Sequence, residues 1–426
     1  MTKEMIPQNL ADVKGEEGRK LVVGIDVGSR YGVAVACLRE GDGKIVYKDR
    51  FKVYQDRRSY ELFSQRIEEW KRKYGCDTVV IGMEPTLTVW KPLYRFLKDK
   101  GYVCVLVACM TTSTLKRTVH SSPNKTDIQD AKTIGNAVWN GYYSYFLDRS
   151  EEIEELRSLC RYHYLEGKDL TRLKNRARGI LYYCFPEVLD FFKDIFSSRS
   201  GMYLLEHYPF PEDIVSVGFD KLWKELREVS HGLLRAERVA SLVGLARESI
   251  GFGFGGSAER EQLRWIIREI REKIERKLDL EREIRARVEG IEESKYMMSI
   301  DGVGYIGCGT IIGETGGLSK FKTVKQLLKY CGLDLYEHSS GKMESGRRIS
   351  KYGNAYVRHI IGQLGFIQFQ EGKPFHWKYL RLKARGKSVD VIRVAIGIHI
   401  LRVMFALVRD KKFFDPSLFM VDRVAV

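Results

Sequence analysis

The sequence predicts an α/β domain near the N-terminus, then a long helical region and a mainly helical C-terminal domain. Short apolar runs alternate with helical periodicity over residues 21–147, as in domains where helices cover a sheet. From about residue 150 the apolar residues recur every three or four positions, which indicates long amphipathic helices. The 426 residues exceed one typical hydrophobic core, so several domains are expected.

The predicted α/β domain follows a polar, flexible tail at residues 1–20. It opens with LVVGIDVGSRYGVAVACL (21–38), two apolar runs around a Gly-Ser turn, which is typical of a strand hairpin. The elements expected next are helix 59–74, strand 76–84, helix 88–99, strand 102–108 and helix 125–141. Ligand sites are expected at the strand ends of such a domain.

Residues 148–295 are predicted to form a helical, coiled-coil linker region. Ile153, Leu156 and Cys160 begin the stripe of one long amphipathic helix with a basic outer face. A second long helix is expected over 257–290, with charged faces that suit a coiled coil within the chain or between subunits. An ordinary surface helix fits the same pattern. The intervening residues 186–256 are mixed, without an assigned role, and GFGFGG (251–256) indicates a loop or linker.

The C-terminal domain, residues 296–426, is predicted to be mainly helical. SIDGVGYIGCGTIIGETG (299–316) indicates a helix, a tight glycine turn and a second helix, and further helices are expected at 324–333, 352–370 and 388–409. Between them lies YEHSSGKMESGRRISKYGN (336–354), which is rich in serine, glycine and basic residues. Such a segment is either a solvent-exposed loop without a chemical role or a loop that acts on a negatively charged substrate.

Composition narrows the class of partner. The net charge of +16 favours a polyanion, most commonly nucleic acid, although a soluble protein can simply be basic. No apolar run is expected to reach the roughly 20 residues of a membrane span, and the polar start does not resemble a secretory signal. A cytoplasmic, nucleoid-associated protein without a membrane partner is therefore expected. The eight cysteines lack C-x-x-C spacing, so no zinc site is predicted.

Four carboxylates form a candidate metal site. Asp26 and Glu84 each end a predicted strand, and Asp127 and Asp130 share one face of a predicted helix. Four acids gathered at strand ends would repel one another unless a cation neutralised them, and oxygen ligands favour Mg²⁺, with Mn²⁺ possible. Such a site can hold a phosphodiester. Taken singly, Asp26 could be a turn residue and Asp127 a helix N-cap.

These motifs resemble a known family. VVGIDVGSRYGVAV, VVIGMEPT and KTDIQDAKTIG resemble the RuvC-like DEDD domain of prokaryotic insertion-sequence transposases of the IS-one-ten family, relatives of the Piv DNA invertases. The family's second domain is resembled by three further stretches, SIDGVGYIGCGTIIGETG, FKTVKQLLKYCGL and SSGKMESGRRISKYGNAYVRHIIGQLG. Residues 372–415 resemble the C-terminal end of the family's sequences. The resemblance implies a RuvC/RNase H-like fold for residues 21–147 and a transposase domain over 296–426.

The resemblance also implies the chemistry. Ser340, just before Gly341, would attack DNA to give a phosphoserine intermediate, and adjacent Ser339 leaves an alternative. Asp26, Glu84, Asp127 and Asp130 would hold Mg²⁺ in the same reaction. Nearby basic residues could stabilise charge on the phosphate, and Gly353 could let the backbone approach DNA closely. These basic residues are Lys342, Arg347, Arg348, Lys351 and Arg358. Serines that cap a turn among solvated cations are the structural alternative.

The partners that the resemblance implies are donor and target DNA, a structured guide (bridge) RNA, and further copies of the chain in a dimer or tetramer. Three other functions remain open. One is a RuvC-like two-metal, junction-resolving nuclease with a structural serine, the second is a Piv-type site-specific DNA invertase, and the third is a non-catalytic nucleic-acid-binding protein.

Overall fold

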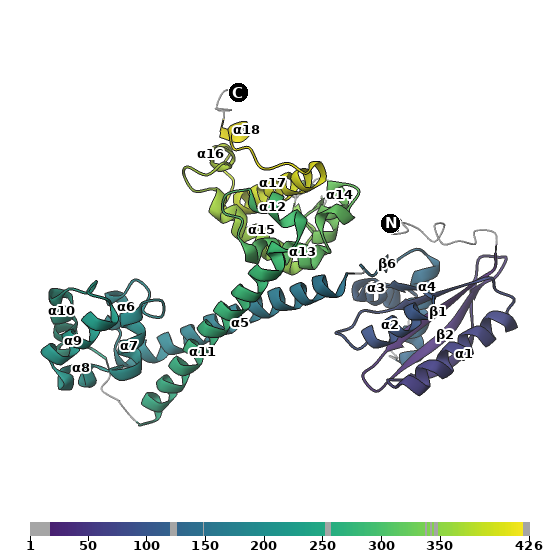
Figure 1. The fold of residues 1–426 in the computed structure, drawn as a ribbon. Coiled ribbons are helices and arrows are strands. Elements are labelled where there is room, and N and C mark those ends of the chain that lie inside the picture. The colour runs from purple at the N-terminus through teal and green to yellow at the C-terminus, as the bar shows by residue number, and fades with distance from the viewer. Residues whose placement is uncertain are drawn as a thin grey trace. The chain divides into compact units, whose positions relative to one another are not determined.

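The computed structural model describes residues 18–119, 126–147, 149–251, 257–336, 339–340, 343–344 and 348–420 (Figure 1). The chain divides into two compact units, Met1–Asp148 and Arg149–Val426. The first unit is an α/β domain with a mixed sheet, and the second unit is mostly helical. This succession confirms the predicted order of an α/β region followed by helical regions.

The first unit is built on a six-stranded sheet in the order β3-β2-β1-β4-β5-β6. Its strands are β1 Lys20–Val27, β2 Tyr31–Arg39, β3 Ile45–Tyr54, β4 Thr78–Met83, β5 Val103–Leu106 and β6 Ser144–Tyr145. Strands β1, β4 and β5 are mutually parallel, whereas β2, β3 and β6 pair antiparallel with their neighbours. The predicted hairpin is confirmed, with Asp26 opposite Val33.

Helices cover both faces of the sheet because β1 alternates its buried side chains. Val23 and Ile25 share a core with α1 Arg57–Lys73 and α2 Lys91–Asp99. Val22 belongs to a second core with α4 Asp127–Trp139. Sequence reasoning missed β3, an edge strand that buries only Val53, and α3 Cys109–Val119, which lacks a clear apolar stripe.

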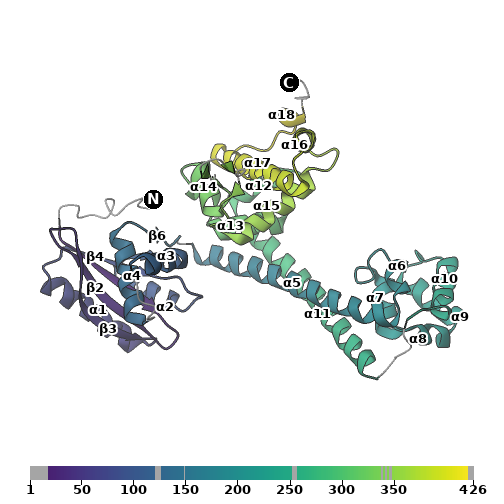
Figure 2. The same cartoon turned by 180° about the vertical axis from the view of Figure 1, so that it is seen from behind.

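Two long helices organise the second unit, α5 Glu151–Cys184 and α11 Ser257–Glu289. They pack against each other in antiparallel directions (Figure 2). Three cross-helix contacts show this direction: the ion pairs Glu155–Arg287 at 3.1 Å and Glu166–Lys273 at 3.0 Å, and a hydrogen bond between His163 and Glu281 at 2.9 Å. Both predicted helices are confirmed, and the coiled coil stays a prediction.

The segment between these helices, to which the sequence assigned no role, is itself helical. Residues 187–247 contain α6 Glu187–Phe191, α7 Arg199–His207, α8 Pro211–Val217, α9 Phe219–Val229 and α10 Ala236–Arg247. They bury their own core, including Phe196, Phe210 and Leu222, against Leu181 of α5 and Ile267 of α11. Helices of five to twelve residues are too short for their apolar spacing to stand out in a sequence window. Gly253, Gly255 and Gly256 lie outside the described residues.

The remaining helices form the C-terminal core. They are α12 Glu292–Met298, α13 Tyr305–Thr315, α14 Val324–Cys331, α15 Ala355–Gln368, α16 His376–Ala384, α17 Val389–Asp410 and α18 Ser417–Met420, with the short 3₁₀ helix η2 Leu318–Lys320. The predicted helices at 324–333, 352–370 and 388–409 are confirmed. In the range 299–316 only the glycine turn and the second helix, α13, are found, because α12 already ends at Met298.

The expectation that no apolar stretch has membrane length was wrong for α17. This helix is long and apolar enough to cross a membrane by length and composition. Its residues Ile392, Ile396, Ile400 and Met404 are nevertheless fully buried in the C-terminal core. A core helix of a folded domain passes the same test, so the burial explains its composition.

Candidate active site

The fold brings the four predicted carboxylates to one edge of the sheet. Asp26 is the penultimate residue of β1, and Glu84 directly follows β4. These strands are adjacent and parallel with Ile25 opposite Met83, so Asp26 and Glu84 lie side by side in register. Asp127 and Asp130 occupy the first turn of α4, which packs on β1. Asp127 is not the N-cap, because the Thr126 side chain accepts from Gln129 N.

Glycines set the close approach of α4 to β1. A Cβ atom at Gly24 would lie 2.2 Å from the carbonyl oxygen of Ala131 and 2.5 Å from the nitrogen of Gly135. A Cβ atom at Gly135 would lie 2.4 Å from Cys37 Sγ. Contacts this short are forbidden sterically, so only glycine allows the helix to sit where it carries Asp127 and Asp130 toward Asp26.

Electrostatics show that the four acids act on one another. The pKa of Asp26 is raised from its ordinary value of 3.8 to about 6 by burial and by the charges of Asp130, Asp127 and Glu84. Burial and like charge both disfavour the ionised form. A shift of this kind is typical of functional carboxylates, whereas a paired structural carboxylate would have its pKa lowered.

Helix α3 supplies two partners that sequence reasoning missed. Lys116 Nζ lies 2.7 Å from Asp130 Oδ1, and Asp130 is buried. Thr112 Oγ1 donates to Glu84 Oε2 at 2.9 Å. Lys116 lowers the pKa of Asp26 slightly against the three acids that raise it. No sequence pattern marked these residues, because α3 itself was not predicted.

The donor set suits a hard divalent cation. Carboxylate oxygens are the ligands that Mg²⁺ and Mn²⁺ prefer. Burial, together with three neighbouring acids, disfavours the negative charge of Asp26, and a bound cation would offset both effects. Among the residues that the structure describes, no three Asp, Glu, His or Cys side chains form a ready-made metal group. The contact of Lys116 with Asp130 is consistent with this, so a metal ion would have to displace the lysine.

The serine loop is described only in part. β7 Leu335–Tyr336 pairs with β10 Arg348–Ile349, and β8 Ser339–Ser340 pairs with β9 Met343–Glu344, with Ser340 opposite Met343. For Ser339, Ser340 and Arg348 the backbone alone is described, and Lys342 and Arg347 lie outside the described residues. Lys351 is exposed and has a φ of +58°.

The base of this loop is held firmly by main-chain contacts. Lys351 N donates to Gly332 O at 3.1 Å, and Asn354 N donates to Tyr330 O at 3.2 Å. A Cβ atom at Gly353 would lie 2.3 Å from Gly332 N, which gives this glycine a packing role within the chain. Arg358 Nη1 donates to Cys331 O at 3.1 Å, so its guanidinium also braces the loop.

Comparison with known proteins decides the family. A family model for DEDD transposases of the IS110 type, described as "Transposase", matches residues 23–186. A second, described as "Transposase IS116/IS110/IS902 family", matches residues 294–375. The chain belongs to the IS110 (IS-one-ten) family of transposases. Members of this family are enzymes that act on DNA.

Curated relatives of the transposase agree. It is 24% identical over 354 residues to the "Insertion element IS110 uncharacterized 43.6 kDa protein" of Streptomyces coelicolor, covering 81% of this chain and 85% of that protein. It is 24% identical to the "Transposase for insertion sequence element IS1111A" of Coxiella burnetii, covering 64% of each. A "Probable family 20 transposase" of Pseudomonas aeruginosa is also 24% identical, over 36% of this chain and 47% of that one.

A buried carboxylate ties the serine loop of the transposase to helix α5. Glu314 of α13 has no exposed surface, and its carboxylate contacts Arg157 Nε at 3.2 Å and Arg161 Nε at 2.5 Å. Asn354 Nδ2, at the end of the loop, donates to Glu314 Oε2 at 2.6 Å. The cationic partners and the amide outweigh burial and lower the pKa of Glu314. Sequence reasoning missed this residue, which sits in an apolar, glycine-rich helix.

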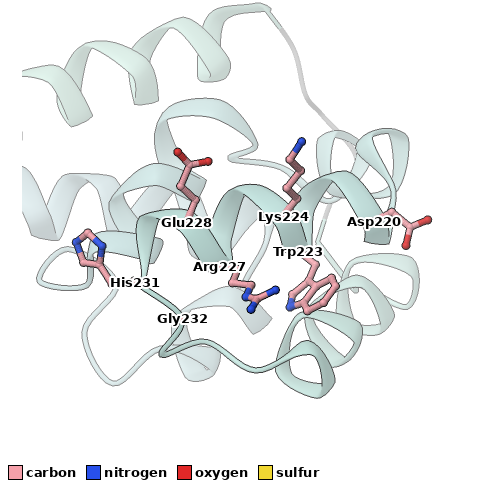
Figure 3. A pocket seen from close by; sticks show the side chains of 7 residues that line it. All are labelled: Asp220, Trp223, Lys224, Arg227, Glu228, His231 and Gly232. Carbon is pink, nitrogen blue, oxygen red and sulfur yellow. The ribbon is translucent and has the colours of Figure 1, made fainter.

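A further hollow of the transposase lies on α9 (Figure 3). It is lined by Asp220, Trp223, Lys224, Arg227, Glu228, His231 and Gly232. Figure 3 shows Lys224 and Glu228 on one side of the helix and Trp223 and Arg227 on the other. Because two acidic and two basic side chains line it, this hollow shows no preference for a charged ligand, and none of the predicted site residues lines it.

Proposed function

We propose that this transposase cuts and rejoins DNA through a phosphoserine intermediate, with Mg²⁺ held by Asp26, Glu84, Asp127 and Asp130. The observation that carries the metal site is the gathering of the four acids at one edge of the sheet, where burial and the other three acids raise the pKa of Asp26 to about 6. A structural role leaves this clustering of like charges unexplained. The sheet, with three antiparallel strands followed by parallel β4 and β5, supports a RuvC-like reading of the first unit.

In the proposed first step the Ser340 oxygen bonds to the scissile phosphorus. The bond from phosphorus to the DNA 3′ oxygen breaks, and the serine proton ends on the freed 3′-hydroxyl. A partner strand's 3′-hydroxyl then attacks the phosphoserine, which releases the serine and joins the strands. A bound divalent cation would supply charge neutralisation at the phosphate. The phosphodiester energy is kept in the intermediate, so no nucleotide cofactor is required.

Cationic side chains of the loop are proposed to stabilise the phosphate. Lys342, Arg347, Arg348 and Lys351 lie within twelve residues of Ser340 in sequence, and Lys351 is exposed. Arg358 is proposed to act through the backbone that it braces, because its guanidinium is bonded to Cys331 O. We further propose that a structured guide RNA selects the DNA, and that two or four copies of the chain assemble in the cytoplasm.

Denaturing electrophoresis with end-labelled donor DNA tests the mechanism. We expect a protein–DNA adduct that survives denaturation, is lost in Ser340→Ala and persists in Ser339→Ala. The reverse pattern would move the nucleophile to Ser339. Free nicked DNA with Ser340→Ala still active would overturn the phosphoserine and favour a two-metal nuclease, whereas full DNA processing by Asp26→Ala would overturn the acidic site.

Guide dependence has a separate test. We expect RNA bound to the purified protein, and we expect RNase treatment to abolish adduct formation until transcript from the DNA flanking the gene is added back. Adduct formation that is unchanged after complete RNA removal would contradict the guide. Inversion, and not insertion, of a marked segment in cells would assign the protein to the Piv-type reaction.

A further inference from the structure

The second unit contains a pocket that the proposed chemistry does not use. It lies among α5, α11, α13 and α15 and has a volume of about 700 Å³. Its walls include Tyr164 and Lys168 of α5, Lys277 of α11, and Tyr356 and His359 of α15. The pocket is therefore assembled from segments more than 190 residues apart in the chain. It borders the first turn of α15, which directly follows the serine loop.

Aromatic rings form one wall of the pocket. The Tyr164 ring lies 5.1 Å from the Tyr356 ring and 4.9 Å from the His359 ring, both edge to face. None of the three residues is fully buried. The Arg161 guanidinium lies 4.4 Å from the Tyr356 ring centroid and covers part of that ring. Ring surface that no neighbour covers can hold a flat ligand, such as a nucleobase, that stacks or packs against it.

The ligand-facing charges are positive. Lys168, Arg172 and Lys277 line the pocket, and no aspartate or glutamate is among its lining residues. Arg172 is paired with Asp169 of its own helix. Lys168 lies 4.9 Å from the Tyr164 ring centroid, and within the described parts of the chain neither Lys168 nor Lys277 has an ion pair with a carboxylate.

Burial and nearby positive charges lower the pKa of two histidines that line the pocket. Burial lowers the pKa of His163, and Lys277 lowers it further, although Glu281 opposes the change. Burial, Lys168 and Arg393 lower the pKa of His359. Both rings are therefore neutral at physiological pH, and a neutral imidazole can donate and accept hydrogen bonds as a nucleobase edge requires.

We propose that this pocket binds one unpaired nucleotide of a nucleic-acid strand, with the base against Tyr164 and Tyr356 and the phosphate on Lys168 and Lys277. Stacking on aromatic side chains together with cations on the backbone is how proteins hold unpaired bases. The aromatic contacts also join α5 to α15, but packing alone does not require uncompensated lysines around an open volume. The inference rests on the proposed action on nucleic acid and is independent of which serine is the nucleophile.

Fluorescence anisotropy with the full-length protein, carrying Ser340→Ala to prevent reaction, tests the pocket. The probes are a labelled single-stranded DNA, a single-stranded RNA of the same sequence, and a blunt DNA duplex. We expect Tyr164→Leu to weaken binding of at least one single strand about tenfold and to leave duplex binding within twofold. We expect Lys168→Gln with Lys277→Gln to weaken the same probe and to reduce its salt slope by about 0.7 per lost phosphate contact.

Lys221→Gln is the matched control, because it removes one exposed lysine from α9 of the same unit. Tyr356→Phe keeps the ring and is expected to bind like the parent. Which single strand responds identifies the source of the nucleotide, DNA or RNA. Equal losses for single strands and duplex, or binding unchanged in both pocket variants while thermal unfolding shows them folded, would overturn the pocket. If the protein with Ser340 intact forms no adduct with DNA, while the pocket variants still weaken binding of a single strand, the proposed function alone would be overturned.

Discussion

Lys116 Nζ lies 2.7 Å from Asp130 Oδ1, so a cation of the chain itself touches the acidic cluster of Asp26, Glu84, Asp127 and Asp130. This lysine partly offsets the repulsion that raises the pKa of Asp26. In the proposed site a metal ion would compete with this lysine for the acids, and mutation of the lysine tests the competition.

Removal of the internal cation is expected to strengthen the response to metal. In Lys116→Gln the four acids lose their compensating charge, so the metal-free protein should be less stable near pH 7, by about 1 kcal/mol. The rise in Tm on adding Mg²⁺ should be larger than in the parent. Differential scanning fluorimetry with and without Mg²⁺ measures both, with Lys48→Gln, a surface lysine paired with Glu40 at 3.6 Å, as the control. An unchanged Mg²⁺ response would contradict the competition.

The raised pKa of Asp26 predicts a pH dependence of stability. The folded state holds this proton more tightly than the unfolded state, so stability is expected to fall as pH rises from about 4 to about 6 and then to level off. Asp26→Asn should remove this loss and be more stable than the parent above pH 6 by about 1 kcal/mol, allowing for partial solvent screening. Urea unfolding at about pH 4.5 and at about pH 7.5, toward the two sides of the titration range, measures the difference.

The DNA-processing activity of Asp26→Asn should fall, whereas its stability should rise. Asp26→Asn is expected to be inactive in DNA processing although it is more stable, because the proposed metal site needs the Asp26 carboxylate as a ligand. Glu61→Gln, a partly exposed acid paired with Lys100 at 2.8 Å, should change neither pH dependence nor activity. A destabilised Asp26→Asn would show instead that Asp26 has a structural role.

The glycine contact between β1 and α4 is expected to control site assembly. Gly24→Ala would place a Cβ atom 2.2 Å from Ala131 O, which must push α4 away from the sheet. We expect a loss of about 1–3 kcal/mol in the free energy of unfolding and a loss of the Mg²⁺-induced rise in Tm. Gly41→Ala, where a Cβ atom would meet nothing within 4 Å, is the control. A Gly24→Ala protein with the parent's Mg²⁺ response would separate helix position from metal binding.

Glu314 is expected to be the most sensitive position in the second unit. Glu314→Ala leaves Arg157 and Arg161 without their buried partner, for an expected cost of about 3–5 kcal/mol, and Glu314→Gln should cost less because it keeps a hydrogen-bonding oxygen. Because the folded pKa of Glu314 is lowered, its contribution is present above its ordinary pKa near 4.5 and is lost as pH falls below it. Chemical unfolding, with the exposed Glu283→Gln as control, measures both effects.

The sequence by itself determined the order of the architecture. Apolar runs with strand spacing and long stripes with helical spacing predicted β1, β2, β4, β5, α5 and α11, because period follows from local backbone geometry. The spacing of apolar residues did not predict α3, β3 or the short helices α6–α10. Each of these elements has few buried residues, so no period can be detected in its sequence. The positions of the four acids, at strand ends and in the first turn of a helix, could be predicted because such positions are visible in the sequence.

Only the tertiary structure decided what surrounds those acids. Strand register places Asp26 beside Glu84, and a glycine contact sets α4 against β1. The approach of α3 then brings Lys116 and Thr112 to Asp130 and Glu84. In the second unit, Glu314 meets Arg157, Arg161 and Asn354 from distant segments. Charge, burial and the resulting pKa depend on distances between atoms far apart in the chain, and spacing along the sequence does not contain those distances.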